Sequence, residues 1–155
     1  MSAEAQVAGT APDYNSLIEG TELPESRIRL RRADLIRYCG ASGDFNVIHW
    51  NERAARAVGL PDVIAHGMLT MAQALRIVTG WLGDPGAVAE YAVRFSRPVI
   101  VPDDDDGAEL RVTARVAKKL PDRRVRIDIV ARAGSEDSGW DKVLSMARAV
   151  VVLPQ

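Results

Sequence analysis

The chain has 155 residues, of which 47% are hydrophobic and 26% are charged, and its formal net charge is −1. This length and composition are typical of one globular domain that buries a substantial core. The small net charge provides no general attraction to nucleic acid or to anionic membranes. A single cysteine, Cys39, excludes a disulfide within the chain and fits a reducing compartment.

The N-terminal residues 1–13 are predicted to form a mobile tail ahead of a single domain that spans residues 14–155. Residues 1–11 lack the basic and apolar regions of a signal peptide. The longest apolar run, residues 68–82, contains polar side chains and is too short to cross a bilayer. We therefore expect a cytoplasmic protein without a membrane span.

The first half of the chain is predicted to be mainly helical. Residues 27–31 alternate between charged and apolar side chains and predict a short strand. Helices are predicted over residues 34–40 and 52–58, the second with Asn51 as its N-cap. A longer, largely buried helix is predicted from Gly67, because apolar residues recur at intervals of three and four: Met68, Leu69, Met71, Ala72, Leu75, Val78 and Leu82.

The second half of the chain is predicted to consist of strands. Alternating or continuous apolar patterns indicate strands in residues 91–95, 110–116, 125–129 and 143–153. Pro121 and Asp122 mark the turn of an antiparallel hairpin, and the run 150–152 suggests burial on both faces. A long helix followed by antiparallel strands predicts the α+β class.

The chemically informative residues lie between the two halves. Asp44 and His49 are five residues apart, and on a continuous helix they would be rotated by roughly 140° from each other. Ser42, Gly43 and Asn46 are turn formers, so we expect a bent loop in which the two side chains converge.

Gly67 follows at the start of the long helix. A carboxylate, an imidazole and a helix N-terminus are suited to adding or removing water next to a carbonyl group.

Structural alternatives remain open for each of these residues. Asp44 in a turn often serves only as a cap, and an isolated histidine such as His49 is often structural. Asn46 either orients the loop or contacts substrate, and His66 either supports the structure or takes part in the site. The residues alone do not assign Asp44 and His49 as acid or base.

Two motifs resemble those of a known family. Residues 43–49 read Gly-Asp-Phe-Asn-Val-Ile-His and resemble the G-D-x-N-P-[LIV]-H signature of the MaoC-like (R)-specific hydratases and dehydratases. Residues 65–69 read Ala-His-Gly-Met-Leu and resemble the family's second motif, and the similarity continues through residues 83–88 and 91–95. Within the family, the chain looks most like the catalytic beta subunits of actinobacterial (3R)-hydroxyacyl-carrier-protein dehydratases.

The resemblance implies a hotdog fold, in which an antiparallel sheet wraps around a long central helix. It also implies a dimer whose sheets join edge to edge, with substrate bound at the interface. The implied partner is either a second copy of the chain or a second hotdog subunit.

The implied reaction is the reversible dehydration of (3R)-3-hydroxyacyl thioesters to trans-2-enoyl thioesters in type II fatty-acid synthesis. Asp44 and His49 are then the catalytic residues. The Gly67 amide holds the thioester oxygen, and Asn46 and His66 complete the oxyanion and substrate-binding region. No metal or cofactor is expected, apart from the phosphopantetheine of coenzyme A or of an acyl carrier protein that carries the substrate.

Two departures from the family pattern bear on the site. Val47 replaces the usual proline, and Leu75 stands where several members have a small or hydroxyl residue that supports the aspartate. Two other functions stay open. One is a self-sufficient homodimeric (R)-specific enoyl-CoA hydratase, and the other is a non-catalytic hotdog subunit that binds acyl groups or a partner. Four basic residues are candidates for contacting the carrier: Arg94, Arg97, Lys118 and Lys119.

Overall fold

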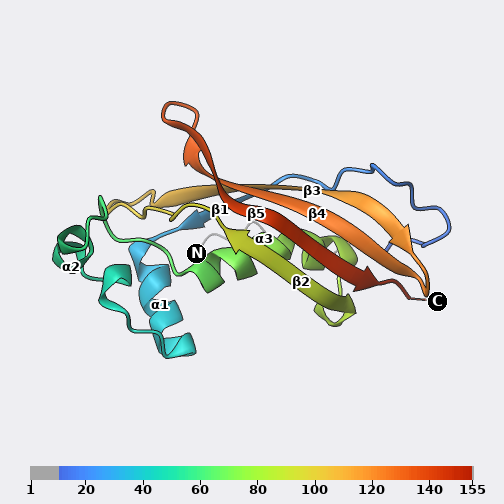
Figure 1. Ribbon diagram of the computed structural model, residues 1–155, viewed down its shortest axis with the longest axis horizontal. Coiled ribbons are helices and arrows are strands. Elements are labelled where there is room, and N and C mark those ends of the chain that lie inside the picture. Colours follow the sequence, from blue (N-terminus) through green and yellow to red (C-terminus); the bar gives the residue numbers. More distant parts are fainter. Residues whose placement is uncertain (1–10, 155) are drawn as a thin grey trace.

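The structure is a computed structural model that describes residues 11–154. Five antiparallel strands form one sheet in the order β1-β3-β4-β5-β2, and the sheet curves over one long helix, α3 (Figure 1). This is the α+β hotdog arrangement expected from the family resemblance. Residues 11–13 of the predicted tail carry no helix or strand, and the rest of the predicted tail lies outside the described residues.

The elements follow the predicted order along the chain. The strands are β1 (Ser26–Leu30), β2 (Val88–Phe95), β3 (Ala108–Leu120), β4 (Arg124–Ser135) and β5 (Gly139–Val152). The helices are α1 (Arg32–Ser42), α2 (Glu52–Ala57) and α3 (Gly67–Leu82), with short 3-10 turns η1 (Val47–His49) and η2 (Pro85–Ala87). No helix within residues 11–154 has the length and apolar character needed to cross a membrane.

The turn predicted at Pro121 and Asp122 is confirmed. It joins β3 to β4, and Asp122 and Arg123 both have positive φ, at 59° and 56°. Two successive positive-φ residues match the twist of the flanking strands. The hairpin between β4 and β5 was not predicted, because residues 134–139 are small and polar and have no apolar alternation. Backbone pairing continues there to the Ser135–Gly139 pair, and the hairpin projects beyond the rest of the sheet (Figure 1).

The core lies between the sheet and one face of α3. Six residues of α3 are buried: Leu69, Thr70, Ala74, Ile77, Val78 and Leu82. The prediction of a largely buried helix holds for most of α3, whose exposed residues are Gly67, Met68, Ala72 and Arg76. Met68 and Ala72, both expected inside, are exposed. Burial on both faces was also predicted for residues 150–152, yet Val152 is exposed at the end of β5.

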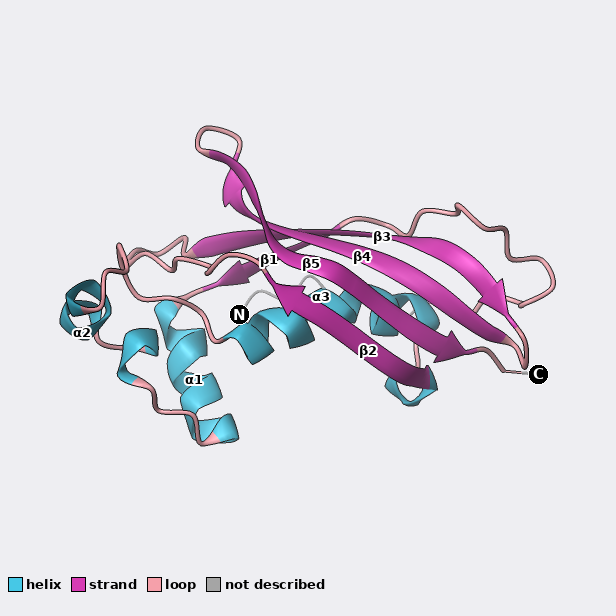
Figure 2. Cartoon of the chain, viewed as in Figure 1, coloured by secondary structure: helices cyan, strands magenta, loops and turns pink. Residues whose placement is uncertain are grey.

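The helices α1 and α2 lie near the N-terminal end of α3 (Figure 2). Leu35 and Cys39 are buried and anchor α1. Arg32 joins α1 to the segment before α3, since its guanidinium lies 2.7 Å from the Asp62 carboxylate and donates to the Val101 carbonyl at 2.6 Å. These contacts tie α1 to the segment that leads into α3.

Residues 63–65, which lead into α3, form an extended segment held by backbone hydrogen bonds. The Ala65 amide donates to the Val99 carbonyl, and the Val101 amide donates to the Val63 carbonyl, both at 2.9 Å. An isolated antiparallel bridge joins Ile64 to Ile100 between them. His66 and Gly67 therefore leave a hydrogen-bonded strand-like segment and enter a helix directly.

Candidate active site

Consecutive short-range turns shape the loop that carries Asp44. Gly43 ends α1 in the left-handed conformation, with φ at 76°, which glycine adopts without the steric penalty of a side chain. The Asp44 carboxylate accepts from the Asn46 amide at 3.1 Å, and the Asn46 side chain accepts from the Ile48 amide at 3.4 Å. The predicted bent loop is confirmed, and the structure supports Asn46 as a turn residue that caps η1.

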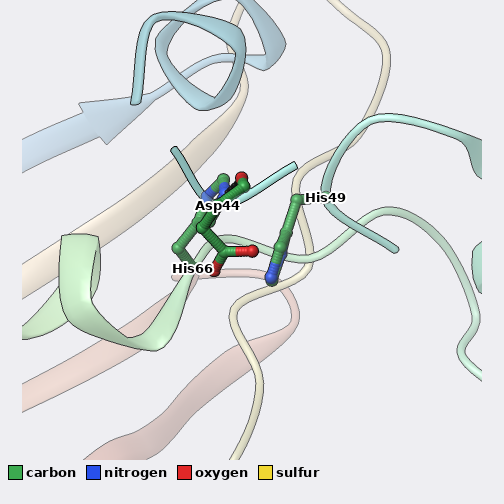
Figure 3. A group of neighbouring side chains, drawn as sticks. All are labelled: Asp44, His49 and His66. Atoms are coloured by element: carbon green, nitrogen blue, oxygen red, sulfur yellow. Dashed lines mark hydrogen bonds between the residues drawn. The ribbon is translucent and has the colours of Figure 1, made fainter. Parts of the chain in front are cut away.

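His49 is buried and held by one hydrogen bond. Its Nδ1 lies 2.8 Å from the Ile64 carbonyl oxygen. A carbonyl oxygen only accepts, so Nδ1 carries a proton, and Nε2 is the atom that has a lone pair whenever the ring is neutral. The His49 ring lies beside the Asp44 carboxylate (Figure 3). A neutral imidazole in this tautomer can take a proton from a substrate placed beside the two side chains.

Asp44, His49 and His66 form one cluster. One ligand-type atom from each lies within 4.8 Å of the others, and these are the residues that could hold a metal ion in the described part of the chain (Figure 3). The rings of His49 and His66 are stacked, with centroids 3.8 Å apart and planes inclined by 23°. In stacked rings the lone pairs lie in two separate, nearly parallel planes, an arrangement that disfavours their meeting at one ion. The geometry is therefore better suited to proton transfer than to chelation.

His66 lies behind the acid–base pair. Only 1% of its surface is exposed, and its Nε2 is 3.1 Å from the backbone oxygen of Asp44. Burial is the main cause that lowers the pKa of His66 below its usual value of 6.5. The ring is therefore neutral at neutral pH. The sequence placed His66 in the oxyanion and substrate-binding region, and the structure places its side chain one layer deeper.

Gly67 presents an unoccupied amide at the start of α3. Its N–H makes no hydrogen bond within residues 11–154, as is usual for the first residue of a helix. A β-carbon at this position would meet Cε1 of Phe95 at 3.2 Å. The ring of Phe95 thus lies over Gly67, and the lack of a side chain leaves access to an amide suited to an anionic oxygen.

The two departures from the family motif have local compensations. Val47 begins η1 where a proline would fit, and the Asn46 cap closes the turn in its place. Leu75 is partly buried against the core and provides no hydrogen bond. The donor to the Asp44 carboxylate is the Asn46 amide, within the same loop.

An apolar rim surrounds the cluster and was not predicted from the sequence. Four large apolar side chains are 44–63% exposed on the segments that carry the site: Phe45, Val47, Met68 and Phe95. The sequence did contain an indication of this rim, since the apolar residues Phe45 and Val47 interrupt a polar turn. Met68 and Phe95 fitted the apolar pattern of their own elements and were assigned to the core. Exposed apolar groups gathered in this way mark a binding surface.

Tyr91 connects β2 to α3 beside this rim. Its hydroxyl donates to the Met71 carbonyl at 2.9 Å, and burial raises the pKa of Tyr91 to about 12. The phenol therefore stays protonated at neutral pH. It serves as a link between the edge strand and the helix and has no acid–base role near neutrality.

Residues 13–131 match the family described as the MaoC like domain. The chain belongs to the MaoC-like domain family. The membership predicted from the two motifs is confirmed, and both motifs lie in the cluster described above.

Relatives of this MaoC-like domain are named as dehydratases. It is 40% identical over 79 residues to 3-hydroxyacyl-thioester dehydratase X of Mycobacterium tuberculosis, covering 51% of the chain and 27% of that protein. It is 30% identical over 100 residues to the mitochondrial 3-hydroxyacyl-[acyl-carrier-protein] dehydratase of Arabidopsis thaliana, covering 64% of the chain and 58% of that protein. The chain thus spans about a quarter of the first relative and somewhat more than half of the second.

Solved structures agree with the fold. A MaoC-like dehydratase has a TM-score of 0.85 and 39% identity, with 94% of this chain and 43% of that chain covered. The R-hydratase PhaJ1 from Pseudomonas aeruginosa has a TM-score of 0.73 and 29% identity, with 92% of this chain and 85% of that chain covered.

Proposed function

We propose that this MaoC-like domain catalyses the reversible dehydration of (3R)-3-hydroxyacyl thioesters to trans-2-enoyl thioesters. One observation carries the proposal: the imidazole of His49, bonded through Nδ1 to Ile64, lies beside the Asp44 carboxylate, with a ligand-type atom of each within 4.8 Å of the other. The free Gly67 amide, on the segment adjoining this cluster, is the oxyanion donor of the proposal. The names of the relatives support the substrate class, since they include dehydratases of hydroxyacyl thioesters and an R-hydratase.

In the dehydration direction, His49 Nε2 takes a proton from the carbon next to the thioester carbonyl. The electron pair of that C–H bond moves toward the carbonyl, and the Gly67 N–H stabilises the charge that develops on the oxygen. The double bond then forms as the C–O bond at carbon 3 breaks, and a protonated Asp44 delivers its proton to the departing hydroxyl, which leaves as water. His49 ends protonated and Asp44 ends as a carboxylate.

The hydration direction reverses each step. The Asp44 carboxylate takes a proton from the attacking water, and the protonated His49 returns a proton to the carbon next to the carbonyl. In both directions the pair holds one proton in total. The assignment of His49 as the base in dehydration, which the sequence left open, rests on the Nδ1 hydrogen bond to Ile64.

The proposed chemistry requires no metal or redox cofactor, because the thioester carbonyl already acidifies the adjacent C–H bond. The substrate would be carried on the phosphopantetheine of coenzyme A or of an acyl carrier protein. Relatives named for each carrier support both, since 3-hydroxybutyryl-CoA dehydratase of Methylorubrum extorquens is 29% identical over 124 residues. Type II fatty-acid synthesis is the proposed setting. The cytoplasm is the proposed compartment, which the buried free thiol of Cys39 supports.

A dimer through β2 is part of the proposal. The edge strand β2 has no second partner within residues 11–154, and its last residue, Phe95, belongs to the apolar rim. The opposite edge, β1, has only five residues and carries Arg27 and Arg29, features that discourage edge pairing. A second copy or a second hotdog subunit on β2 would cover the rim and enclose the acyl chain.

The proposal is tested by the hydration of short- and long-chain trans-2-enoyl-CoA by the purified chain. We expect Asp44→Asn and His49→Gln each to lower turnover by about 10²–10⁴-fold, the usual contribution of a general acid or base. Asp105→Asn, in an exposed acidic loop, is the matched control and should leave turnover unchanged.

Turnover within a few-fold of wild type in either site variant would contradict the mechanism. A folded but inactive wild-type chain would be assayed again with a companion hotdog subunit. Activity restored by the companion indicates a required partner, and continued inactivity favours a non-catalytic acyl-binding or partner subunit.

A further inference from the structure

The contacts of His66 connect two parts of the site that belong to different segments. Its backbone is the N-cap of α3, directly before the Gly67 amide. Its side chain reaches back to the loop that follows α1, where Nε2 lies 3.1 Å from the Asp44 carbonyl oxygen. One residue thus joins the proposed oxyanion donor to the proposed acid.

The hydrogen bond to Asp44 determines the tautomer of His66. Because the Asp44 carbonyl oxygen only accepts, Nε2 must carry the proton. Nδ1 then keeps its lone pair, and this atom is buried without a hydrogen-bond partner in the described part of the chain. A second proton on Nδ1 would therefore have no acceptor to stabilise it.

The surroundings of the ring also disfavour a positive charge. Tyr38 and Cys39 face His66 from α1, with the Tyr38 ring centroid 4.7 Å away and the Cys39 sulfur 3.6 Å from Nε2. His49 stacks on the other side, with ring centroids 3.8 Å apart. The Asp44 carboxylate is the one anionic group of the cluster and favours a charged ring, but burial has the larger effect and lowers the pKa of His66.

We propose that His66 is a positioning residue that holds the Asp44 loop against the start of α3, and that it acts as a neutral imidazole protonated on Nε2. The inference rests on the proposed function and names the residue that sets the geometry of the same site. A neutral ring is required because His49 becomes positively charged when it takes the substrate proton, and a second cation stacked on it would oppose that step.

Two variants separate the hydrogen bond from the stacked ring. His66→Gln keeps an N–H donor near the position of Nε2 and loses the ring. His66→Phe keeps a flat ring against His49 and loses the donor. We expect His66→Phe to lower kcat on the order of 10²-fold, because displacement of a catalytic group by about 1 Å has an effect of that size. KM should change little, since the side chain is buried behind the pair.

We expect His66→Gln to stay within roughly tenfold of the wild-type kcat, because it can still hold the Asp44 carbonyl. Circular dichroism and thermal melting verify that each variant is folded. The proposal is overturned if the folded His66→Phe variant keeps a wild-type kcat, or if His66→Gln is the more impaired of the two.

Nitrogen-15 NMR of the wild-type imidazoles tests the inference without an activity assay. The chain has two histidines, so a single substitution assigns both ring systems. We expect His66 to carry its proton on Nε2 and to remain neutral at neutral pH. An Nδ1-protonated or charged ring would overturn the proposal. Because this readout needs neither substrate nor turnover, it separates a failure of this inference from a failure of the proposed function.

Discussion

At the scale of one residue, the lack of a side chain at Gly67 leaves its backbone amide accessible. It begins α3, its amide is free within the described residues, and the Phe95 ring lies where a β-carbon would point. The contact of 3.2 Å between that β-carbon and Phe95 is tighter than ordinary packing, although Phe95 is exposed and can move. An added methyl group would therefore disturb access to the amide more than it would disturb the fold.

We predict that Gly67→Ala lowers kcat/KM for enoyl-CoA hydration by at least about tenfold, because the thioester oxygen is displaced from its donor. The free energy of unfolding should change by less than about 0.5 kcal/mol, as for other surface substitutions. Steady-state kinetics and denaturant unfolding measure the two quantities. Gly40→Ala, also in a helix and with nothing within 4 Å of its β-carbon, is the matched control. Unchanged kinetics in Gly67→Ala would contradict the proposed role of the Gly67 amide as the oxyanion donor.

At the scale of one element, the edge strand β2 has a charge pattern that suits pairing with a second copy of itself. From Glu90 to Arg94 its outward-facing side chains are Glu90, Ala92 and Arg94, all exposed. If two copies of β2 pair antiparallel about Ala92, each Glu90 lies opposite the Arg94 of the partner. Cross-strand pairs of opposite charge stabilise such an arrangement, and like charges destabilise it. The edge is therefore complementary to itself.

We predict that Glu90→Arg weakens self-association, since it places two arginines opposite each other. Two such pairs form in a symmetric dimer and each contributes roughly 0.2–1 kcal/mol, so the dimer dissociation constant should rise about tenfold. The double variant Glu90→Arg with Arg94→Glu restores opposite charges and should restore association. Sedimentation equilibrium measures both. Equal dissociation constants for wild type and the single variant would exclude this register, and would leave a different hotdog partner as the alternative.

At the scale of the whole molecule, the buried His66 links stability to pH. Burial lowers the pKa of His66 in the folded protein below the ordinary 6.5, to which it returns on unfolding. The unfolded chain therefore binds the proton more readily. By linkage, the contribution of His66 to stability is complete above about pH 6.5 and is lost as the pH falls toward the lowered value.

We predict that the free energy of unfolding of the wild type decreases as the pH is lowered from about 7.5 to about 5.5, and that His66→Gln has a shallower dependence in this window. Denaturant titrations at several pH values measure the two slopes. Parallel slopes for the two proteins would show that His66 does not carry the linkage.

Much of the architecture follows from local patterns. The strands and helices were predicted in the right order because burial on one face imposes a period of two on strands and about 3.6 on helices. The Asp44–His49 loop was predicted from turn formers, whose backbone preferences are local. The strand ends were predicted too short, because residues 134–139 are held by pairing across the sheet and not by burial.

Three features of the site depend on contacts between distant segments and needed the folded chain. The proton position on His49 follows from the Ile64 carbonyl, fifteen residues away in the chain. The buried place of His66 follows from the packing of α1 beside the start of α3. The exposure of Met68 follows from the sheet covering one face of α3 only. Residue type and spacing are enough to predict the elements, the family and the residues of the proposed catalytic pair. Their protonation, depth and orientation needed the fold, because hydrogen-bond partners and burial come from segments that only the folded chain brings together.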